Sequence, residues 1–185
     1  MGRFTITTEY LEEVFPAFKQ LSDLEAKRQI TAVYQDMFAL CKWESLEAAC
    51  FSPALSNCRL VDHINAVMES TLATAHCIEK YQNIPFDYDG IIILAMLHDS
   101  SKLVEYEPTE DGCVETEIGQ KIQHGVYGAM MAREHGFSVK VMNQILTHTP
   151  RSKMKPSDKE SALFARVDLG DADMLHYTNG LPLFD

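Results

Sequence analysis

The chain has 185 residues, 46% of them hydrophobic, with only nine glycines and seven prolines. This length and composition fit one globular domain over residues 1–185 and exclude disordered and fibrous classes. The formal net charge of −11 disfavours a nucleic-acid partner, because phosphate backbones are bound mainly by Lys and Arg. An enzyme this acidic that acts on an anion needs a local positive centre, which bound metal ions can supply.

Neither a membrane nor a secreted protein is indicated. The longest uncharged apolar run, residues 90–97, is too short to span a bilayer, and the first residues lack the apolar stretch of a signal peptide. We therefore expect a cytoplasmic protein. The five cysteines form an odd set without a Cys-x-x-Cys pair, which favours buried free thiols over disulfides or a thiolate zinc site.

Apolar residues recur at helical spacing through nearly the whole chain, which predicts an all-α bundle. Two amphipathic helices, 8–19 and 23–43, form an N-terminal extension over residues 1–50. Residues 50–59 contain Ser, Pro and Asn, which predict a connecting loop. A long helix is expected to follow over 60–81.

The second half continues in the same way, and none of its segments requires a sheet. We expect helices over 91–104, 118–134, 139–148 and 158–174. The acidic segment 106–117 contains an Asp-Gly pair, which is typical of a loop or of a short hairpin.

Several ionisable residues fall at the spacing of the predicted core faces. His63 lies three residues after Leu60, and Asp168 lies four after Phe164. Burying an aspartate is costly without a partner, and a shared cation would satisfy several such groups at once. The residues with this inward spacing are His63, His98, His148 and Asp168.

Lys102 follows His98 by four residues and Asp99 by three, so it projects from the same side of a helix. There it can hold a phosphate oxygen or orient a water, or it can be an ion-pair partner of Asp99 or Glu105. Arg151 and Lys153 also have two possible roles. They follow His148 in a basic loop and either meet a charged substrate or face solvent.

The order of these residues resembles the signature of the HD superfamily of metal-dependent phosphohydrolases, over residues 60–175. Two further histidines, His124 and His148, resemble the additional ligands of the binuclear branch of this superfamily. That branch includes HD-type diadenosine tetraphosphatases and HD-GYP phosphodiesterases. The chain lacks a Gly-Tyr-Pro element, so cyclic dinucleotide cleavage is not expected. The segments that carry the resemblance are ILAMLHDSSK, QHGVYGAMMAREHG, ILTHTP and LFARVDLGDADML.

The resemblance implies an HD-domain helical bundle with two metal sites. One site would use His63, His98, Asp99 and Asp168, and the other would use His124 and His148, with Asp99 bridging the two. Imidazole and carboxylate ligands suit divalent transition metals, with iron or manganese first and zinc or nickel as alternatives.

We therefore expect a hydrolase that cleaves a phosphoester or phosphoanhydride of a small molecule, with a nucleotide as the expected class. A metal-bound hydroxide would attack phosphorus, and Lys102 would hold an oxygen of the phosphoryl group. The alternative is a di-iron oxygenase that resembles myo-inositol oxygenase and uses the same ligands. The N-terminal helices either cap the core or form a homodimer contact, and the sequence leaves both open.

Overall fold

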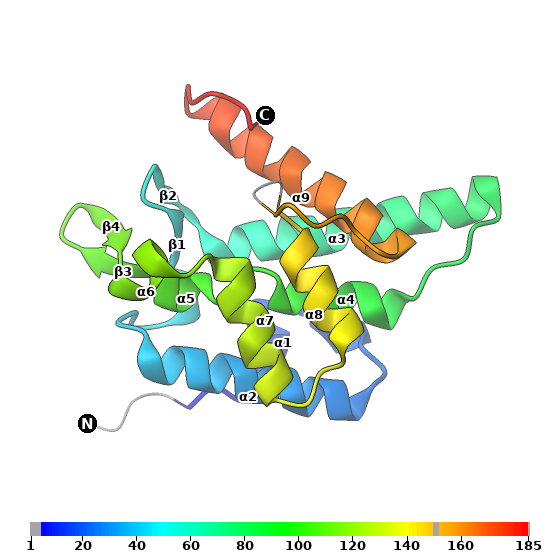
Figure 1. Ribbon diagram of the computed structural model, residues 1–185, viewed down its shortest axis with the longest axis horizontal. Helices are drawn as coiled ribbons and strands as arrows, with labels where there is room; N and C mark the ends of the chain where they lie inside the picture. Colours follow the sequence, from blue (N-terminus) through cyan, green and yellow to red (C-terminus); the bar gives the residue numbers. More distant parts are fainter. Residues whose placement is uncertain (1–4, 150–151, 185) are drawn as a thin grey trace.

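The structure is a computed structural model that describes residues 5–149 and 152–184. It is mostly helical, which confirms the predicted all-α class (Figure 1). Short 3₁₀ turns lie at Pro16–Gln20 and Leu46–Ala48. The helices are α1 (Thr8–Val14), α2 (Leu24–Leu40), α3 (Leu60–Gln82), α4 (Tyr88–Leu97), α5 (Lys102–Glu105), α6 (Glu117–Lys121), α7 (His124–Glu134), α8 (Val139–Thr147) and α9 (Lys159–Thr178).

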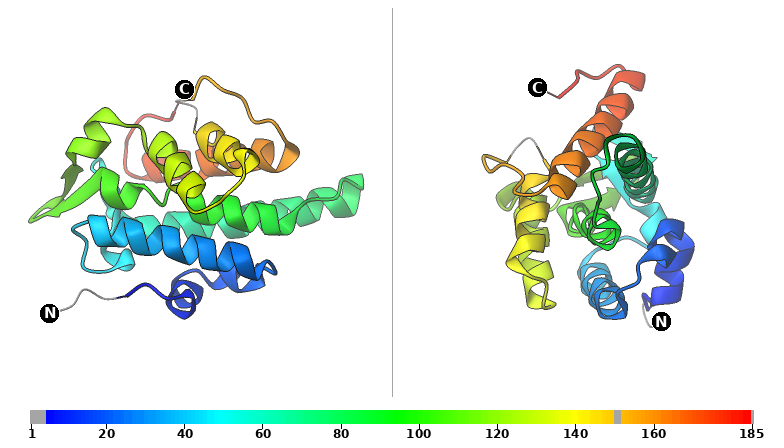
Figure 2. Two further views of the ribbon diagram at one scale, coloured as in Figure 1. Left: turned by 60° about the horizontal axis from the view of Figure 1, so that its bottom comes forward. Right: turned by 90° about the vertical axis from the view of Figure 1, so that its right-hand side faces the viewer.

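Helix α4 occupies the centre of the bundle. The Asp87 side chain caps its N-terminus by accepting a hydrogen bond from the Gly90 amide, and every residue from Ile91 to Leu97 except Ile93 is buried. Helices α2, α3, α8 and α9 pack around it (Figure 2). This enclosure explains why the segment is apolar on all sides rather than along one stripe.

The N-terminal helices share the core of the rest of the chain. The buried residues of α1 and α2 belong to the same apolar cluster as those of α4, and the Tyr34 hydroxyl donates a hydrogen bond to the Met96 carbonyl at 2.8 Å. The expectation of one helix over 8–19 is wrong, because α1 ends at Val14. Pro16 follows, and its ring and missing N–H are incompatible with a helix interior.

The predicted helix 91–104 is interrupted between Leu97 and Lys102. The Ser100 hydroxyl bonds to the Leu97 carbonyl, and serine side chains that bond to nearby backbone compete with helical pairing. The Ser101 hydroxyl instead donates to the carbonyl of His124 at 2.7 Å. This turn therefore ties the end of α4 to the start of α7.

The predicted helix 118–134 is also two helices, α6 and α7. The break follows from a close packing of α6 on the end of α5: a Cβ at Gly119 would lie 2.5 Å from the Glu105 carbonyl oxygen. Gln123 is extended and precedes α7, so His124 is the first residue of that helix. The break turns the His124 side chain towards the interior.

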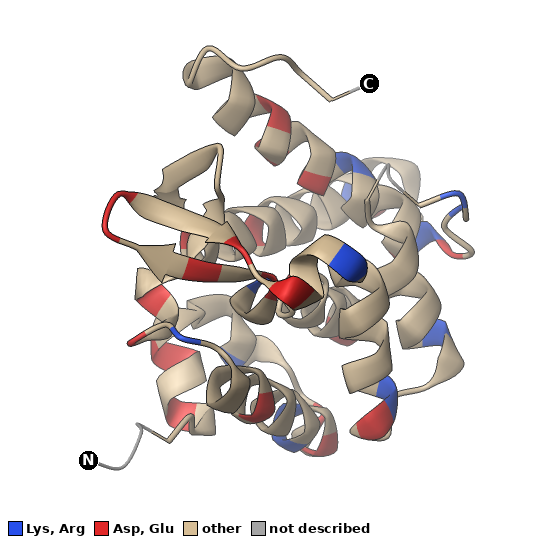
Figure 3. Ribbon diagram, turned by 60° about the vertical axis from the view of Figure 1, so that its left-hand side comes forward, with Lys and Arg blue, Asp and Glu red and all other residues tan. Residues whose placement is uncertain are grey.

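Two antiparallel hairpins are present, although no segment of the sequence required a sheet. Residues 50–59, expected as a loop, form β1 (Cys50–Ser52) and β2 (Leu55–Arg59). In 106–117 the hairpin alternative is confirmed, with β3 (Tyr106–Thr109) paired to β4 (Gly112–Glu115). Acidic side chains line the second hairpin (Figure 3). Over the described part of the chain, no helix is both long and apolar enough to cross a membrane.

Candidate metal centre

The structure brings all six predicted ligands to one buried place. They come from five separate elements: α3, the turn after α4, the start of α7, the end of α8 and the middle of α9. Each ligand is at most 8% exposed. The six are His63, His98, Asp99, His124, His148 and Asp168.

A first group of ligand atoms surrounds Asp99 Oδ2. The Nε2 atoms of His63 and His98 lie 3.3 Å and 3.5 Å from this oxygen and 3.5 Å from each other. Asp168 Oδ1 lies 3.1 Å from His63 Nε2 and 3.7 Å from His98 Nε2. Atoms bound at about 2.1 Å to one ion are roughly 3.0–3.4 Å apart, so this spacing suits a single cation.

A second group surrounds the other oxygen of the same carboxylate. Asp99 Oδ1 lies 3.5 Å from His124 Nε2 and 3.6 Å from His148 Nε2, and the two nitrogens are 3.3 Å apart. Both groups have ligand atoms close enough to hold a metal ion. Asp99 therefore presents one oxygen to each group.

The rings are oriented by the nitrogens that point away from Asp99. His98 Nδ1 donates to the Ala95 carbonyl at 2.8 Å, and His148 Nδ1 donates to the Ile145 carbonyl at 2.5 Å. Since a carbonyl can only accept, Nδ1 carries the proton and Nε2 presents a lone pair. This is the orientation that a metal-binding imidazole requires.

Acidic residues hold the other two rings. His63 Nδ1 lies 2.6 Å from Asp171 Oδ2, and His124 Nδ1 lies 3.3 Å from Glu105 Oε2. The sequence did not identify which acidic residues would orient these rings. Spacing was the available signal, because Asp171 is three residues after Asp168 on the same helix and Glu105 is three after Lys102.

These contacts test whether a cation fits the site. In each group, two ring nitrogens face each other, at 3.5 Å and 3.3 Å; with the proton of each ring on Nδ1, as metal binding requires, two lone pairs would meet, which is repulsive. Asp99 Oδ1 is buried and accepts no hydrogen bond from the described residues. Such an orphaned carboxylate oxygen is costly. A cation in each group would remove both problems, so the residues fit two metal ions.

The net charge of the centre also favours bound cations. Four carboxylates, of Asp99, Asp168, Asp171 and Glu105, face one ammonium, that of Lys102. Burial alone would lower the pKa of His63, but contacts with three of the carboxylates outweigh it and raise the pKa to about 10. In the metal-free protein His63 is thus protonated, and its positive charge balances part of the charge of the four carboxylates.

The pKa values of His98 and Asp99 are both lowered, for different reasons. Burial dominates at His98 and lowers its pKa to about 4. Burial would raise the pKa of Asp99, but the Lys102 ammonium and the neighbouring imidazoles hold it well below its usual range. Asp99 is therefore ionised and available to bridge two cations.

Lys102 lies at the edge of this centre. Its Nζ is 2.9 Å from Asp99 Oδ2 and 3.8 Å above the centroid of the Phe51 ring. The ion pair with Asp99 that the sequence left open is present. Phe51 also packs on the His63 ring, with 4.5 Å between centroids, so one aromatic side chain contacts both a ligand and the lysine.

A cavity of about 320 Å³ lies directly over the ligands. Its floor includes His63, Asp99, His124, His148 and Asp168, and Lys102 also lines it. The walls come from the β1–β2 turn, from β3 and β4, from α9 and from the chain after it. The ligands are thus reachable from outside through this cavity.

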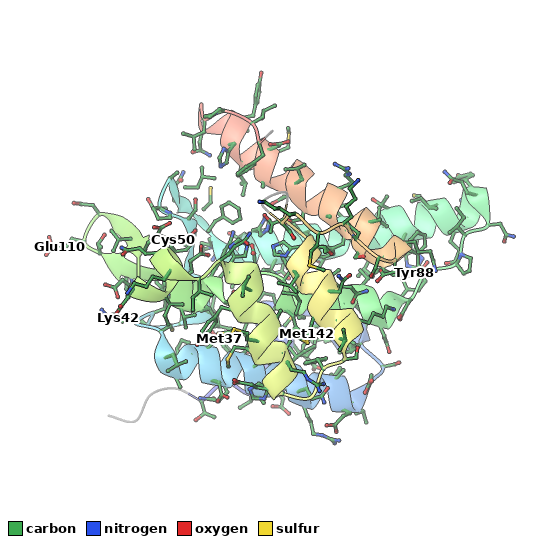
Figure 4. All side chains as sticks on the ribbon, in the orientation of Figure 1. Met37, Lys42, Cys50, Tyr88, Glu110 and Met142 are labelled. Atoms are coloured by element: carbon green, nitrogen blue, oxygen red, sulfur yellow. A yellow bond between two sulfur atoms is a disulfide. The ribbon has the colours of Figure 1, made fainter. Side chains whose placement is uncertain are left out.

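A disulfide joins two of these walls, which corrects the expectation of free thiols. Cys50 of β1 is bonded to Cys113 of β4 (Figure 4 labels Cys50). The pair is 63 residues apart in sequence, and the other three cysteines are free. No local pattern of the sequence indicated this pairing, because it depends on how the two hairpins pack.

Of the other predicted site residues, Lys153 is not brought to the centre. Lys153 is exposed and is not among the residues that line the cavity, and Arg151 lies outside the described residues.

Comparisons with protein-family models, with curated proteins and with solved structures find no match to this chain.

Proposed function

We propose that the protein is a binuclear metal-dependent phosphohydrolase of the HD type. One observation carries the proposal: the two oxygens of Asp99 face two separate groups of ligand atoms, each spaced for one cation. A shared carboxylate would place two ions side by side, as in enzymes that cleave phosphate esters. The divalent metals that suit this ligand set are iron and manganese, then zinc and nickel.

When bound, two such ions lower the pKa of a water and offset the charge that develops at phosphorus. The residues of the chain do the rest. Asp171 and Glu105 hold the rings of His63 and His124 in position. Lys102 Nζ, beside Asp99 and open to the cavity, binds a phosphoryl oxygen. The walls of the cavity limit the access of bulk water, which strengthens these electrostatic contacts.

Metal analysis and a phosphate-release screen test the proposal together. Protein purified without oxygen should contain two transition-metal ions per chain and release phosphate from a phosphorylated small molecule. His124→Ala should lose the second ion and most of the activity. His135→Ala is the matched control, since His135 follows the same helix and pairs with Asp36 at the surface.

Two outcomes would contradict the proposal. A His124→Ala protein with full metal content and full activity would rule out the second site. Oxygen uptake that depends on an added substrate would identify the alternative, a di-iron oxygenase. Anaerobic phosphate release favours the hydrolase, because hydrolysis consumes only water.

A further inference from the structure

The cavity over the metal centre divides into a polar floor and a mainly apolar upper part. Above the ligands, the β1–β2 turn contributes Ala54, α9 contributes Leu169 and Ala172, and the chain after α9 contributes Phe184. Phe51 lies at the boundary, with Lys102 on its ring. The part of the cavity beyond the floor is thus mainly apolar, and its polar lining residues are Ser52, Glu115, Thr149 and His176.

The charges around the cavity are too few for several phosphates. Among the described residues that line it, Lys102 is the only lysine or arginine. The charged residue on the wall is an acid, Glu115, which is exposed at the end of β4. Further acidic residues lie along the β3–β4 hairpin (Figure 3). A second or third phosphate would have to lie against apolar walls or beside these carboxylates.

The size of the cavity sets a further limit. At about 320 Å³ it is at the small end of ligand pockets, which span roughly 300–1,000 Å³. Two metal ions and a phosphoryl group would occupy part of this volume. The remaining space favours one compact organic group.

We propose that the substrate is a monophosphate ester of a compact, uncharged alcohol with an apolar or aromatic body. This inference rests on the proposed function. The phosphoryl group lies on the floor beside Lys102, and the body lies between the β1–β2 turn and α9. A water oxygen forms a bond to phosphorus while the ester P–O bond breaks. The electron pair of that bond stays on the alcohol oxygen, which takes one proton of the water, and the other proton leaves with the phosphate.

Comparison of substrates tests this inference in the manganese-loaded protein. Phenyl phosphate should be cleaved with a kcat/KM at least about tenfold above that of ATP or diadenosine tetraphosphate, because its one ring fills the apolar part. A preference for either polyphosphate would overturn the inference and leave the proposed function intact. If no phosphate ester or anhydride is cleaved, the proposed function fails, and the binding experiment still decides on the subsite.

Calorimetry with two non-hydrolysable probes measures the subsite without catalysis. Phenylphosphonate should bind the manganese-loaded protein at least about tenfold more tightly than methylphosphonate, because only the phenyl group reaches the apolar part. Equal affinities, or no binding of either probe, would overturn the inference.

A variant of the exposed turn locates the subsite. Ala54 lines the cavity and is itself exposed, so Ala54→Phe fills the apolar part without disturbing the core. It should weaken phenylphosphonate binding at least about tenfold and leave methylphosphonate binding unchanged. Glu110→Phe, which adds the same ring on the exposed turn of the other hairpin and outside the cavity lining, is the control and should keep both affinities. Equal losses for both probes in Ala54→Phe, or no loss for either, would contradict the placement of the organic group.

Discussion

The floor and the walls of the cavity are built in different ways. The floor consists of side chains from α3, α4, α7, α8 and α9, whose backbones pack in the main core, and its groups are held by contacts with one another. The walls consist of two short hairpins, which a disulfide joins, and the chain after α9. The β1–β2 hairpin packs with α9 and the chain after it in a second, smaller apolar cluster, whereas Tyr106 and Cys113 of the other hairpin belong to the main core. In the proposed enzyme, metal binding would therefore depend on the floor and substrate choice on the walls.

The largest effect should come from the carboxylate shared by both groups of ligands. Asp99→Asn removes the charge that faces both ions, so both should be lost. Because metal ions contribute several kcal/mol to such reactions, phosphate release should fall at least about a thousandfold. Elemental analysis and the phosphate assay measure this. Asp62→Asn, on the exposed face of α3, should change neither, and retention of both ions by Asp99→Asn would remove the basis of the bridge.

The walls can be weakened without touching the floor. Replacing both Cys50 and Cys113 by serine opens a loop of 63 residues, which should lower the free energy of unfolding by up to roughly 4 kcal/mol. Urea denaturation measures this loss. The metal content should stay at the wild-type level. The control pair Cys58→Ser and Cys77→Ser removes free thiols, and loss of metal in the first pair alone would show that the floor depends on the walls.

Within the floor, the two groups of ligands should respond separately to their supporting acids. Glu105→Gln should weaken metal binding at the His124 side, and Asp171→Asn should weaken it at the His63 side, each about 10- to 100-fold. Competition with a chelator measures both affinities. Glu107→Gln, two residues after Glu105 in sequence but paired with Lys42 at the surface, is the control. If either variant weakened both sites equally, the groups would not be separable.

The smallest effect is a dependence of metal affinity on pH. The metal-free His63 ring has a pKa raised to about 10, so below that pH it carries a proton that an ion must displace. Affinity should therefore rise with pH, by up to about tenfold per unit. Calorimetry in buffers of different ionisation enthalpy should detect the released proton. Asp171→Asn removes one of the contacts that raise the pKa, so its affinity should depend less on pH near neutrality.

Two ligands of the floor were predictable from spacing because they lie within long helices, where position along the chain fixes direction, whereas Asp99 and His124 were expected from the family resemblance. His63 and Asp168 share a face with buried apolar neighbours on α3 and α9, so helical spacing alone directed both inward. The helix breaks before Lys102 and before His124 were missed. Each depends on a contact between remote segments, such as the bond from Ser101 to the carbonyl of His124.

The structure of the walls could largely not be predicted from the sequence, because it also depends on contacts between remote segments. Strands as short as Cys50–Ser52 have too few residues to show an alternating pattern. The partner of Cys50 is determined by the packing of β1 on β4, which no local feature encodes. Phe51 also gave no signal, although it contacts both Lys102 and His63.

The disulfide also has a consequence for the unfolded chain. The covalent ring that it closes, residues 50–113, contains His63, His98 and Asp99, whereas His124, His148 and Asp168 lie outside it. Denaturation without reduction therefore keeps three of the six ligands at a high effective concentration of one another. Metal that remains on this ring would reduce the stabilisation gained from metal in the native state, since only preferential binding to the folded form shifts the equilibrium. Reduction would disperse the three ligands and restore the full difference.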